Sequence, residues 1–230
     1  LVFGVKSYMA DKKRVEVKAV WKWWNLGLSL FSIWGASRTV PHLIHSLMHP
    51  DRGFKYTVCY PAARDYGLGA CGLWTMLFIF SKVPELFDTA FIVLIKARLI
   101  FLHWYHHVTV LLYCWHSYGT RNAAGLWFIA MNYSVHAVMY MYYFMSNYYP
   151  KGKTPGAFFV TSIQISQMFV GVTICYYTYV FKTEDPTCSV TWENWRAGLI
   201  MYASYFCLFV WFAINRYCPC WKKEKKPKKE

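Results

Sequence analysis

The chain has 230 residues, of which 57% are hydrophobic and only 16% are charged. Soluble domains usually carry about 45–50% apolar and about 25% charged residues, so this composition argues against a soluble domain. The net charge of +14 could indicate nucleic-acid binding. The basic residues, however, flank apolar runs and end in a lysine-rich tail without any nucleic-acid motif. We therefore expect contact with anionic lipid and no nucleic-acid partner.

Six apolar runs are long enough to cross a bilayer, which takes roughly 20 residues each. We expect an all-α polytopic membrane protein with a single domain over residues 1–230. Residues 1–9 are expected to be the end of a truncated first span, and residues 218–230 a basic cytosolic tail. The six predicted full spans are 20–43, 67–95, 99–115, 123–143, 156–181 and 195–214.

The linkers predict the orientation of these spans. Lysine and arginine gather before the first span, around 96–98, around 151–153 and in the tail, and six spans put all four groups on one side. An excess of these residues marks the cytoplasmic side. Lys226 and Lys228, fifth and third from the end, match the dilysine pattern for retrieval to the endoplasmic reticulum (ER). We expect a multi-pass ER membrane protein with a cytosolic C-terminus.

Two cysteines, Cys59 and Cys188, fall in loops on the opposite side of the membrane. The ER lumen is oxidising, and disulfides form and persist there. We predict a disulfide between these two residues, with two unpaired thiols as the alternative.

The second span contains three charged residues, Lys82, Glu85 and Asp88. Each charge at a span centre costs about 2.5–3.5 kcal/mol on insertion scales. The three-residue spacing lets neighbours touch along a helix, and Pro84 predicts a kink. Ionisable residues inside a membrane are functional candidates by default. A triad that only locks helices together would fit the same spacing.

Polar residues at helical spacing continue in the next three spans. They are His103, His106 and His107 in the third, Asn132, His136 and Tyr140 in the fourth, and Gln164 and Gln167 in the fifth. With alternating span directions and a rise of about 1.5 Å per residue, all fall in the cytosolic half of the bilayer. We predict one polar chamber open to the cytosol. For the glutamines alone, interhelical hydrogen bonding explains the pattern equally well.

Four motifs on consecutive spans resemble the very-long-chain fatty-acid elongase (ELO) family. They are Lys82-x-x-Glu85-x-x-Asp88-Thr89, His103-x-x-His106-His107, His136-x-x-Met139-Tyr140 and Gln164-x-x-Gln167. The resemblance implies a 3-ketoacyl-CoA synthase that uses acyl-CoA and malonyl-CoA without a tightly bound cofactor. It also implies two three-helix units around an acyl tunnel. The residues around His103 look most like the subgroup acting on saturated and monounsaturated chains. The family usually has seven spans.

The resemblance also implies roles for the residues in these motifs. His106 is expected to accept the acyl group, His136 to assist from the facing helix, and His103 and His107 to orient the site and stabilise oxyanions. Lys82, Glu85, Asp88 and Thr89 would support the histidines, while Asn132, Met139, Tyr140, Gln164 and Gln167 would contact substrate. Lys96, Arg98, Lys151 and Lys153 would meet the CoA phosphates. Expected partners are the 3-ketoacyl-CoA reductase, 3-hydroxyacyl-CoA dehydratase and enoyl-CoA reductase of the elongation cycle, and a second copy of the chain.

Two other classes of protein remain open. A membrane di-iron desaturase or hydroxylase also carries a HxxHH box but needs about eight histidine ligands. The chain has eight histidines in all, and four of these, His42, His45, His49 and His116, lie at the lumenal ends of spans. A zinc held by three histidines is a further alternative, although we expect no metal. A lipid transporter would show interrupted helices or an inverted repeat, for which the sequence offers only a weak three-plus-three pattern.

Overall fold

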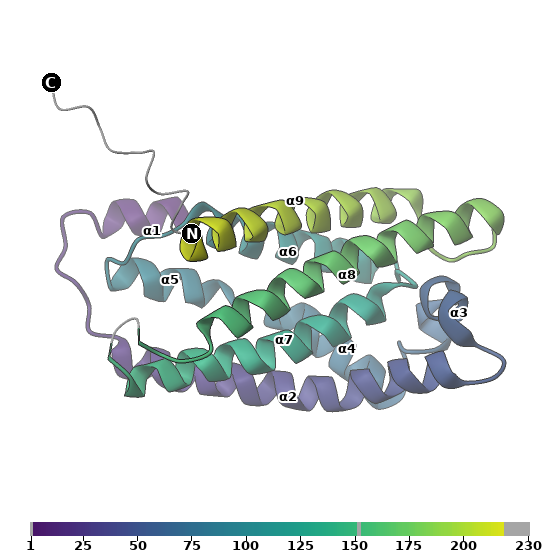
Figure 1. Ribbon diagram of the computed structural model, residues 1–230, viewed down its shortest axis with the longest axis horizontal. Helices are drawn as coiled ribbons and strands as arrows, with labels where there is room; N and C mark the ends of the chain where they lie inside the picture. The colour runs from purple at the N-terminus through teal and green to yellow at the C-terminus, as the bar shows by residue number, and fades with distance from the viewer. Residues whose placement is uncertain (1, 151–152, 219–230) are drawn as a thin grey trace, which may run out of the picture.

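The computed structural model describes residues 2–150 and 153–218 as an elongated bundle of helices (Figure 1). These residues form nine α-helices and two short 3-10 helices, and no strand. The elements are α1 (Val2–Tyr8), α2 (Lys18–Met48), α3 (Gly53–Cys59), η1 (Ala62–Arg64), α4 (Gly69–Ser81), α5 (Leu86–Leu94), α6 (Phe101–Gly119), α7 (Gly125–Met145), η2 (Ser146–Tyr148), α8 (Ala157–Glu184) and α9 (Trp192–Tyr217).

Each of the six predicted spans coincides with one long helix or, for the second span, with the pair α4 and α5. This second span is interrupted over residues 82–85, where Pro84 supplies no backbone donor, so the predicted kink is confirmed. By length and hydropathy, two helices of the described residues, α8 and α9, could cross a membrane. The count of six spans therefore stays a prediction.

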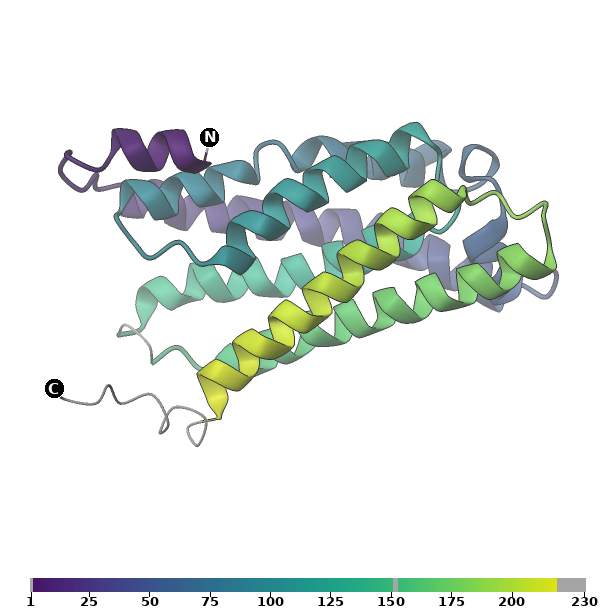
Figure 2. The ribbon, with the colours of Figure 1, turned by 90° about the horizontal axis from the view of Figure 1, so that it is seen from above.

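The long helices pack as a closed ring. Around this ring, α2 contacts α4 and α7, α6 contacts α4, α5 and α9, and α8 contacts α7 and α9. Two halves follow one another, the first made of α2, α4–α5 and α6, and the second of α7, α8 and α9 (Figures 1 and 2). The two three-helix units around an acyl tunnel that the family resemblance implies stay a prediction, since α2 and α7, from different halves, pack together extensively. The ring encloses an interior to which every member of it can contribute side chains.

A stripe of small residues lets α2 and α7 pack closely. Its members, Ser29, Ser32, Gly35 and Thr39, lie three to four positions apart on the buried face of α2. Ser29 Oγ donates a hydrogen bond of 2.8 Å to the Ala137 carbonyl of α7. At Gly35 an added Cβ would come within 2.4 Å of the Tyr133 ring, so no larger residue fits without movement. Small residues at helix contacts are typical of membrane proteins because backbones can then approach.

The bundle has two unlike ends. At one, which we call the disulfide end, Cys59 at the end of α3 is bonded to Cys188 in the loop between α8 and α9. The predicted disulfide is therefore confirmed. The opposite end, the cavity end, carries residues 95–100, 146–150 and 153–156, which lie between the long helices. Lys226 and Lys228 lie outside the described residues, so the predicted retrieval signal stays a prediction.

Candidate active site

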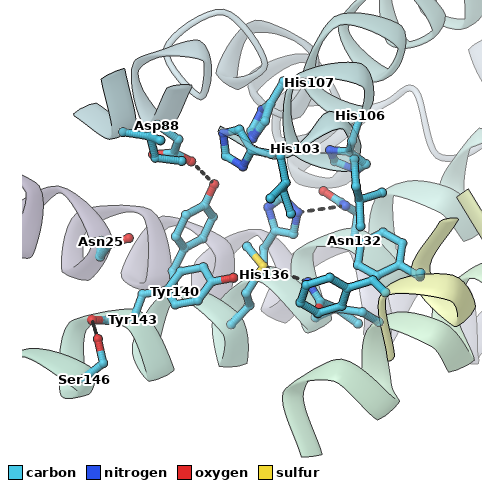
Figure 3. Close-up of a pocket in the computed structure, with 18 of the residues that line it drawn as sticks. Asn25, Asp88, His103, His106, His107, Asn132, His136, Tyr140, Tyr143 and Ser146 are labelled. Carbon is cyan, nitrogen blue, oxygen red and sulfur yellow. Dashed lines mark hydrogen bonds between the residues drawn. The ribbon is translucent and has the colours of Figure 1, made fainter. Parts of the chain in front are cut away.

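A cavity of about 400 Å³ opens inside the ring of helices, toward the cavity end (Figure 3). Its walls come from α2, α5, α6, α7, α8 and α9. Ten of the predicted site residues line it: His103, His106, His107, His136, Asp88, Asn132, Met139, Tyr140, Gln164 and Gln167. The prediction that polar groups from separate helices meet in one chamber is therefore confirmed. Three others, Lys82, Glu85 and Thr89, lie behind this wall.

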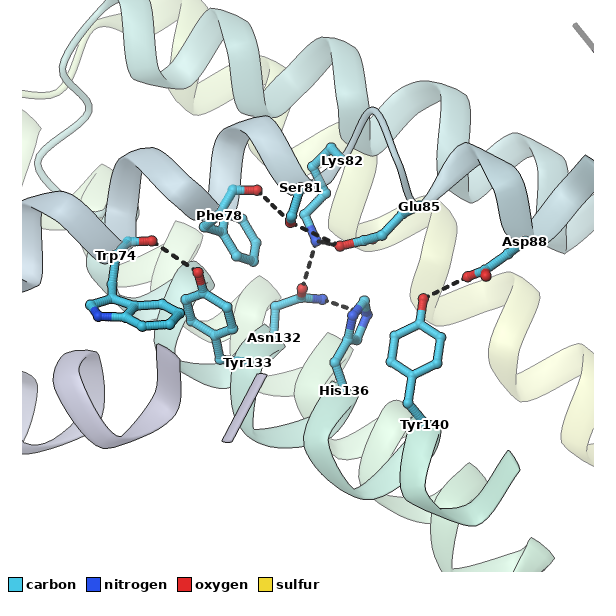
Figure 4. A network of polar contacts seen from close by, with 10 residues as sticks. All are labelled: Trp74, Phe78, Ser81, Lys82, Glu85, Asp88, Asn132, Tyr133, His136 and Tyr140. Atoms are coloured by element: carbon cyan, nitrogen blue, oxygen red, sulfur yellow. Dashed lines mark hydrogen bonds and ion pairs between the residues drawn. The ribbon is translucent and has the colours of Figure 1, made fainter. Parts of the chain in front are cut away.

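The break between α4 and α5 places a buried ion pair beside α7 (Figure 4). Lys82 Nζ lies 2.7 Å from Glu85 Oε1, and the two side chains are only 2% and 4% exposed. The same ammonium donates a 3.1 Å hydrogen bond to Asn132 Oδ1 on α7 and lies 4.0 Å from the centre of the Phe78 ring. Burial of the Lys82 ammonium is compensated by geometry, since it has two oxygen acceptors and an aromatic face. The second oxygen of Glu85, Oε2, is buried without a hydrogen-bond partner among the described residues.

Asn132 extends this ion pair to a catalytic candidate. Its Nδ2 lies 3.1 Å from His136 Nε2, one turn further along α7. The contacts from Glu85 through Lys82 and Asn132 to His136 form a continuous chain of polar groups (Figure 4). The spacing of four between Asn132 and His136, noted in the sequence, puts both side chains on one face of the helix.

The third charge of the second span, Asp88, is held from two other helices. Tyr140 on α7 donates to Asp88 Oδ2 at 2.6 Å, and Trp24 on α2 donates to Asp88 Oδ1 at 2.8 Å. The sequence spacing suggested contact with Glu85, but the carboxylate is instead shared between α2 and α7. Asp88 therefore ties three members of the ring together at the cavity wall, as Figure 3 shows for Tyr140.

The three histidines of α6 occupy different positions in the site. His103 Nε2 is hydrogen-bonded to Thr89 Oγ1 at 3.1 Å, and the rings of His103 and His107 lie 4.6 Å apart. The His106 ring packs against Tyr205 of α9 at 4.8 Å. Within the described residues, the His106 imidazole makes no hydrogen bond. Its nitrogens are thus available to a substrate in the cavity.

Tyr205 also fixes the backbone that carries His106. Its hydroxyl is within 2.6 Å of Thr109 Oγ1 and donates to the His106 carbonyl at 3.2 Å. The residue is almost fully buried, at 1% exposure. These contacts hold α6 against α9 at the helical turn that contains His106.

The two glutamines of α8 both line the cavity. Gln164 Nε2 donates to Met139 Sδ at 3.2 Å, which links α8 to α7. Gln167 is buried at 6% exposure. Gln164 therefore makes an interhelical contact and also faces the cavity, while its role in substrate binding stays a prediction.

The predicted phosphate-binding residues that the structure describes lie at the cavity end but not in the cavity wall. Lys96, Arg98 and Lys153 are exposed, and Lys96 Nζ donates to the Ala10 carbonyl at 3.1 Å. Lys151 lies outside the described residues. A cation that the sequence analysis missed, Lys22 of α2, does line the cavity, with its ammonium 4.2 Å from the centre of the Tyr148 ring.

Among the residues of this site that sequence reasoning missed are Lys22, Trp24, Asn25 and Tyr205. Asn25 lines the cavity and could have been found as a polar residue inside an apolar run, by the criterion that found Asn132. Trp24 and Tyr205 carried no signal, because the chain contains 12 tryptophans and 19 tyrosines. Lys22 lies near the start of the predicted span 20–43 and resembled the basic residues that precede this span.

Two further predictions concern histidines: that the protein holds no metal ion, and that the histidines at the lumenal ends of the spans lie away from the chamber. Among the described residues, no group of three His, Cys, Asp or Glu side chains is placed to hold a metal ion. The expectation that the protein uses no metal or bound cofactor stays a prediction. His42 bonds Asp65 at 3.0 Å near the disulfide end, and His45 and His49 lie with ring centres 5.7 Å apart. None of these three histidines lines the cavity.

Comparison with known proteins agrees with the motifs. The family model described as "ELO: GNS1/SUR4 family" matches residues 1–229. Fatty acid elongase 3 of Trypanosoma brucei brucei is 42% identical, over 91% of this chain and 77% of its own length. Very long chain fatty acid elongase 6 is 42% identical in Drosophila melanogaster, over 94% of this chain and 68% of its own length. The protein of that name in Homo sapiens is 39% identical, over 98% and 83%. The chain belongs to the ELO (GNS1/SUR4) family of membrane-associated fatty acid elongation enzymes.

Proposed function

We propose that the chain is a 3-ketoacyl-CoA synthase, an acyltransferase that condenses a long-chain acyl-CoA with malonyl-CoA and releases carbon dioxide and CoA. Family membership supports fatty acid elongation. The observation that carries the condensation step is the convergence of four histidines from two helices, α6 and α7, on one cavity that also exposes amide side chains. The motif surroundings of His103 support saturated and monounsaturated acyl chains as substrates.

His106 is the residue proposed to carry the acyl group. Its imidazole nitrogen attacks the thioester carbonyl, the carbon–sulfur bond breaks, and CoA leaves as the thiol with the imidazole proton. Malonyl-CoA then loses carbon dioxide, and the resulting enolate carbon attacks the acyl-imidazole. The new carbon–carbon bond frees His106, which takes up a proton. Histidine is a known covalent catalyst. The imidazoles of His106 and His107 both line the cavity without a hydrogen bond among the described residues, and the family resemblance is what favours His106.

The other cavity residues hold the reacting groups. His103 and His107 flank His106 on the same helix, within reach of the oxygen on which charge develops. Gln164 and Gln167 offer amide groups to the peptide-like bonds of the CoA arm. The Asp88 carboxylate and its two donors fix the positions of α2, α5 and α7 around the cavity.

The cavity end is proposed to face the cytosol, in an ER membrane crossed by six helices. This orientation rests on the basic linkers at that end and brings the CoA nucleotide toward Lys96, Arg98, Lys151 and Lys153. Lys22, whose side chain lines the cavity, joins this set. Lysine binds phosphate as a point charge.

The product of the proposed reaction, a 3-ketoacyl-CoA, must be reduced, dehydrated and reduced again to complete one round of elongation. Passing a membrane-bound intermediate between enzymes favours physical association with the 3-ketoacyl-CoA reductase, the 3-hydroxyacyl-CoA dehydratase and the enoyl-CoA reductase. These partners, and a second copy of the chain, are proposals that co-purification from detergent would test.

The test is product analysis with purified protein, labelled malonyl-CoA and a series of acyl-CoAs. The proposal predicts 3-ketoacyl-CoA and labelled carbon dioxide in equal amounts without added metal or oxygen. Acyl-CoA alone should acylate the wild-type protein and release free CoA, while His106→Ala should do neither. Transport without loss of carbon dioxide would point to a lipid transporter, and bound iron with oxygen dependence to a desaturase.

A further inference from the structure

The chain of buried polar contacts that ends at His136 determines which nitrogen of this histidine carries the proton. Lys82 Nζ is 2.7 Å from Glu85 Oε1 and 3.1 Å from Asn132 Oδ1, and Asn132 Nδ2 is 3.1 Å from His136 Nε2. The four residues are 2% to 7% exposed. Water therefore has little access with which to substitute for any of these partners.

The ammonium at the start of the chain fixes the orientation of the Asn132 amide. A lysine ammonium offers three donors and no acceptor, and the adjacent Glu85 carboxylate stabilises this charged form. The group of Asn132 that faces Lys82 must therefore be its carbonyl oxygen, because an NH₂ group there would set donor against donor. The NH₂ group then necessarily faces His136.

The orientation of Asn132 in turn fixes His136. An amide NH₂ can only donate, so the ring nitrogen that meets it, Nε2, must accept through its lone pair. In a neutral imidazole the other nitrogen, Nδ1, then holds the proton. The Nδ1 atom makes no hydrogen bond within the described residues, and His136 lines the cavity. Figure 3 shows the ring inside the cavity with Asn132 on one side of it.

We propose that Lys82 acts through Asn132 as a positioning residue, which holds His136 as the neutral Nδ1–H tautomer and so makes it a hydrogen-bond donor to the substrate. The inference rests on the proposed function and sharpens it. With its Nε2 lone pair engaged, His136 donates to the oxygen of the thioester or enolate. The covalent step stays with His106, as in the proposed function. Glu85 holds the Lys82 ammonium in place through their 2.7 Å contact.

The direct test is the nitrogen NMR spectrum of the full chain in detergent micelles or nanodiscs, with ¹⁵N-labelled histidine. Protonated and unprotonated ring nitrogens have well-separated shifts, and the signals of His136 are assigned by their loss in His136→Gln. The wild type is expected to show a protonated Nδ1 and an unprotonated Nε2 at neutral pH. A wild-type His136 with its proton on Nε2 overturns the proposal. The tautomer is read from the wild-type spectrum, and His136→Gln serves only to assign its signals.

The matched variant is Asn132→Asp, which keeps the shape of the side chain but offers only acceptors to His136. It should move the proton of His136 onto Nε2 and lower kcat about 100-fold, the usual effect of losing one oxyanion donor, with KM unchanged. Unchanged His136 shifts in a folded Asn132→Asp protein contradict the proposal. Ser134→Ala, which removes only a bond from α7 to its own Ala130 carbonyl, should alter neither shifts nor rate.

The tautomer of His136 is measured on the protein without substrate. Failure of the tautomer proposal can therefore be told apart from failure of the proposed function. If His136 is the Nδ1–H tautomer but the protein makes no 3-ketoacyl-CoA, the role of Lys82 and Asn132 stands and the proposed condensation is wrong. If the protein condenses acyl-CoA with malonyl-CoA while His136 carries its proton on Nε2, the proposed function stands and the role of Lys82 and Asn132 is wrong.

Discussion

Two lysine–carboxylate pairs of almost equal length lie in opposite surroundings in this molecule. At the disulfide end, Lys55 and Asp185 meet at 2.8 Å with side chains 48% and 32% exposed. In the interior, Lys82 and Glu85 meet at 2.7 Å with side chains 2% and 4% exposed. Water and salt screen the first pair, whereas each ion of the second pair depends on its protein partners.

This difference shows what each region of the protein is built for. The disulfide end joins its segments by a covalent bond, Cys59–Cys188, and its ion pair adds little to that bond. The interior instead contains charges that a purely structural bundle could replace with packed apolar residues at no loss of stability. Their retention beside four cavity histidines fits a role in the chemistry of the site.

Breaking the interior pair should have the largest effect on stability. Glu85→Gln leaves the buried Lys82 without its counter-charge, and we expect a loss of about 3–5 kcal/mol in the free energy of unfolding. Thermal unfolding of purified protein in detergent measures this effect. The double variant Lys82→Met with Glu85→Gln should recover part of the loss, since neither charge then remains. If the double variant is no more stable than the single one, the pair is not the cause.

Removing the disulfide should have the second-largest effect on stability. Cys59→Ser together with Cys188→Ser opens a link between residues 129 positions apart, and we expect destabilisation of about 2–5 kcal/mol. Cys207→Ser, at an exposed free cysteine, is the matched control and should change stability by less than about 0.5 kcal/mol. A wild-type melting temperature that is indifferent to reducing agent would count against this account.

The basic residues at the cavity end should influence substrate binding more than stability. Lys153→Glu and Lys22→Met are each expected to raise KM for CoA substrates roughly fivefold, which corresponds to about 1 kcal/mol of an exposed charge interaction. Added salt should reduce the difference from wild type. Steady-state kinetics at two ionic strengths measures both effects. An unchanged KM would remove the residue concerned from the proposed phosphate site.

The exposed pair at the disulfide end should show the smallest effect, with a defined pH dependence. The Lys55 ammonium and the Thr187 donors lower the pKa of Asp185 to about 2, from an ordinary value of about 3.9. A depressed carboxyl pKa stabilises the fold above about pH 4. This contribution disappears as the pH falls through about 2. Lys55→Met should therefore lower the melting temperature slightly at pH 7, and the difference from wild type should vanish below about pH 2. A difference that persists there contradicts this assignment.

Local periodicity was enough to predict much of the molecule. The helical spacing of His103, His106 and His107, the kink at Pro84 and the contact between Lys82 and Glu85 all depend on residues within a few positions of one another. These features appear in the structure as the sequence led us to expect. The disulfide was predictable because the linker charges placed both cysteines on one side.

Contacts between distant segments were not predictable in the same way. Trp24 reaches Asp88 across 64 residues and Tyr205 reaches the His106 carbonyl across 99. Their positions depend on how the ring of helices closes, for which no local pattern exists. We expected the side chains of Glu85 and Asp88 to touch. The Asp88 carboxylate instead binds Trp24 and Tyr140, because Asp88 follows the break before α5 and faces α2 and α7.

The comparison of the two ends also supplies the most direct test of the account. Condensation of acyl-CoA with labelled malonyl-CoA should be measured for His106→Ala, in the cavity, and for His45→Ala, near the disulfide end. Both purified proteins should show normal melting temperatures. We predict that His106→Ala makes no 3-ketoacyl-CoA while His45→Ala retains wild-type activity. Normal product formation by a folded His106→Ala protein would contradict the claim that the histidine cavity is where the carbon–carbon bond forms.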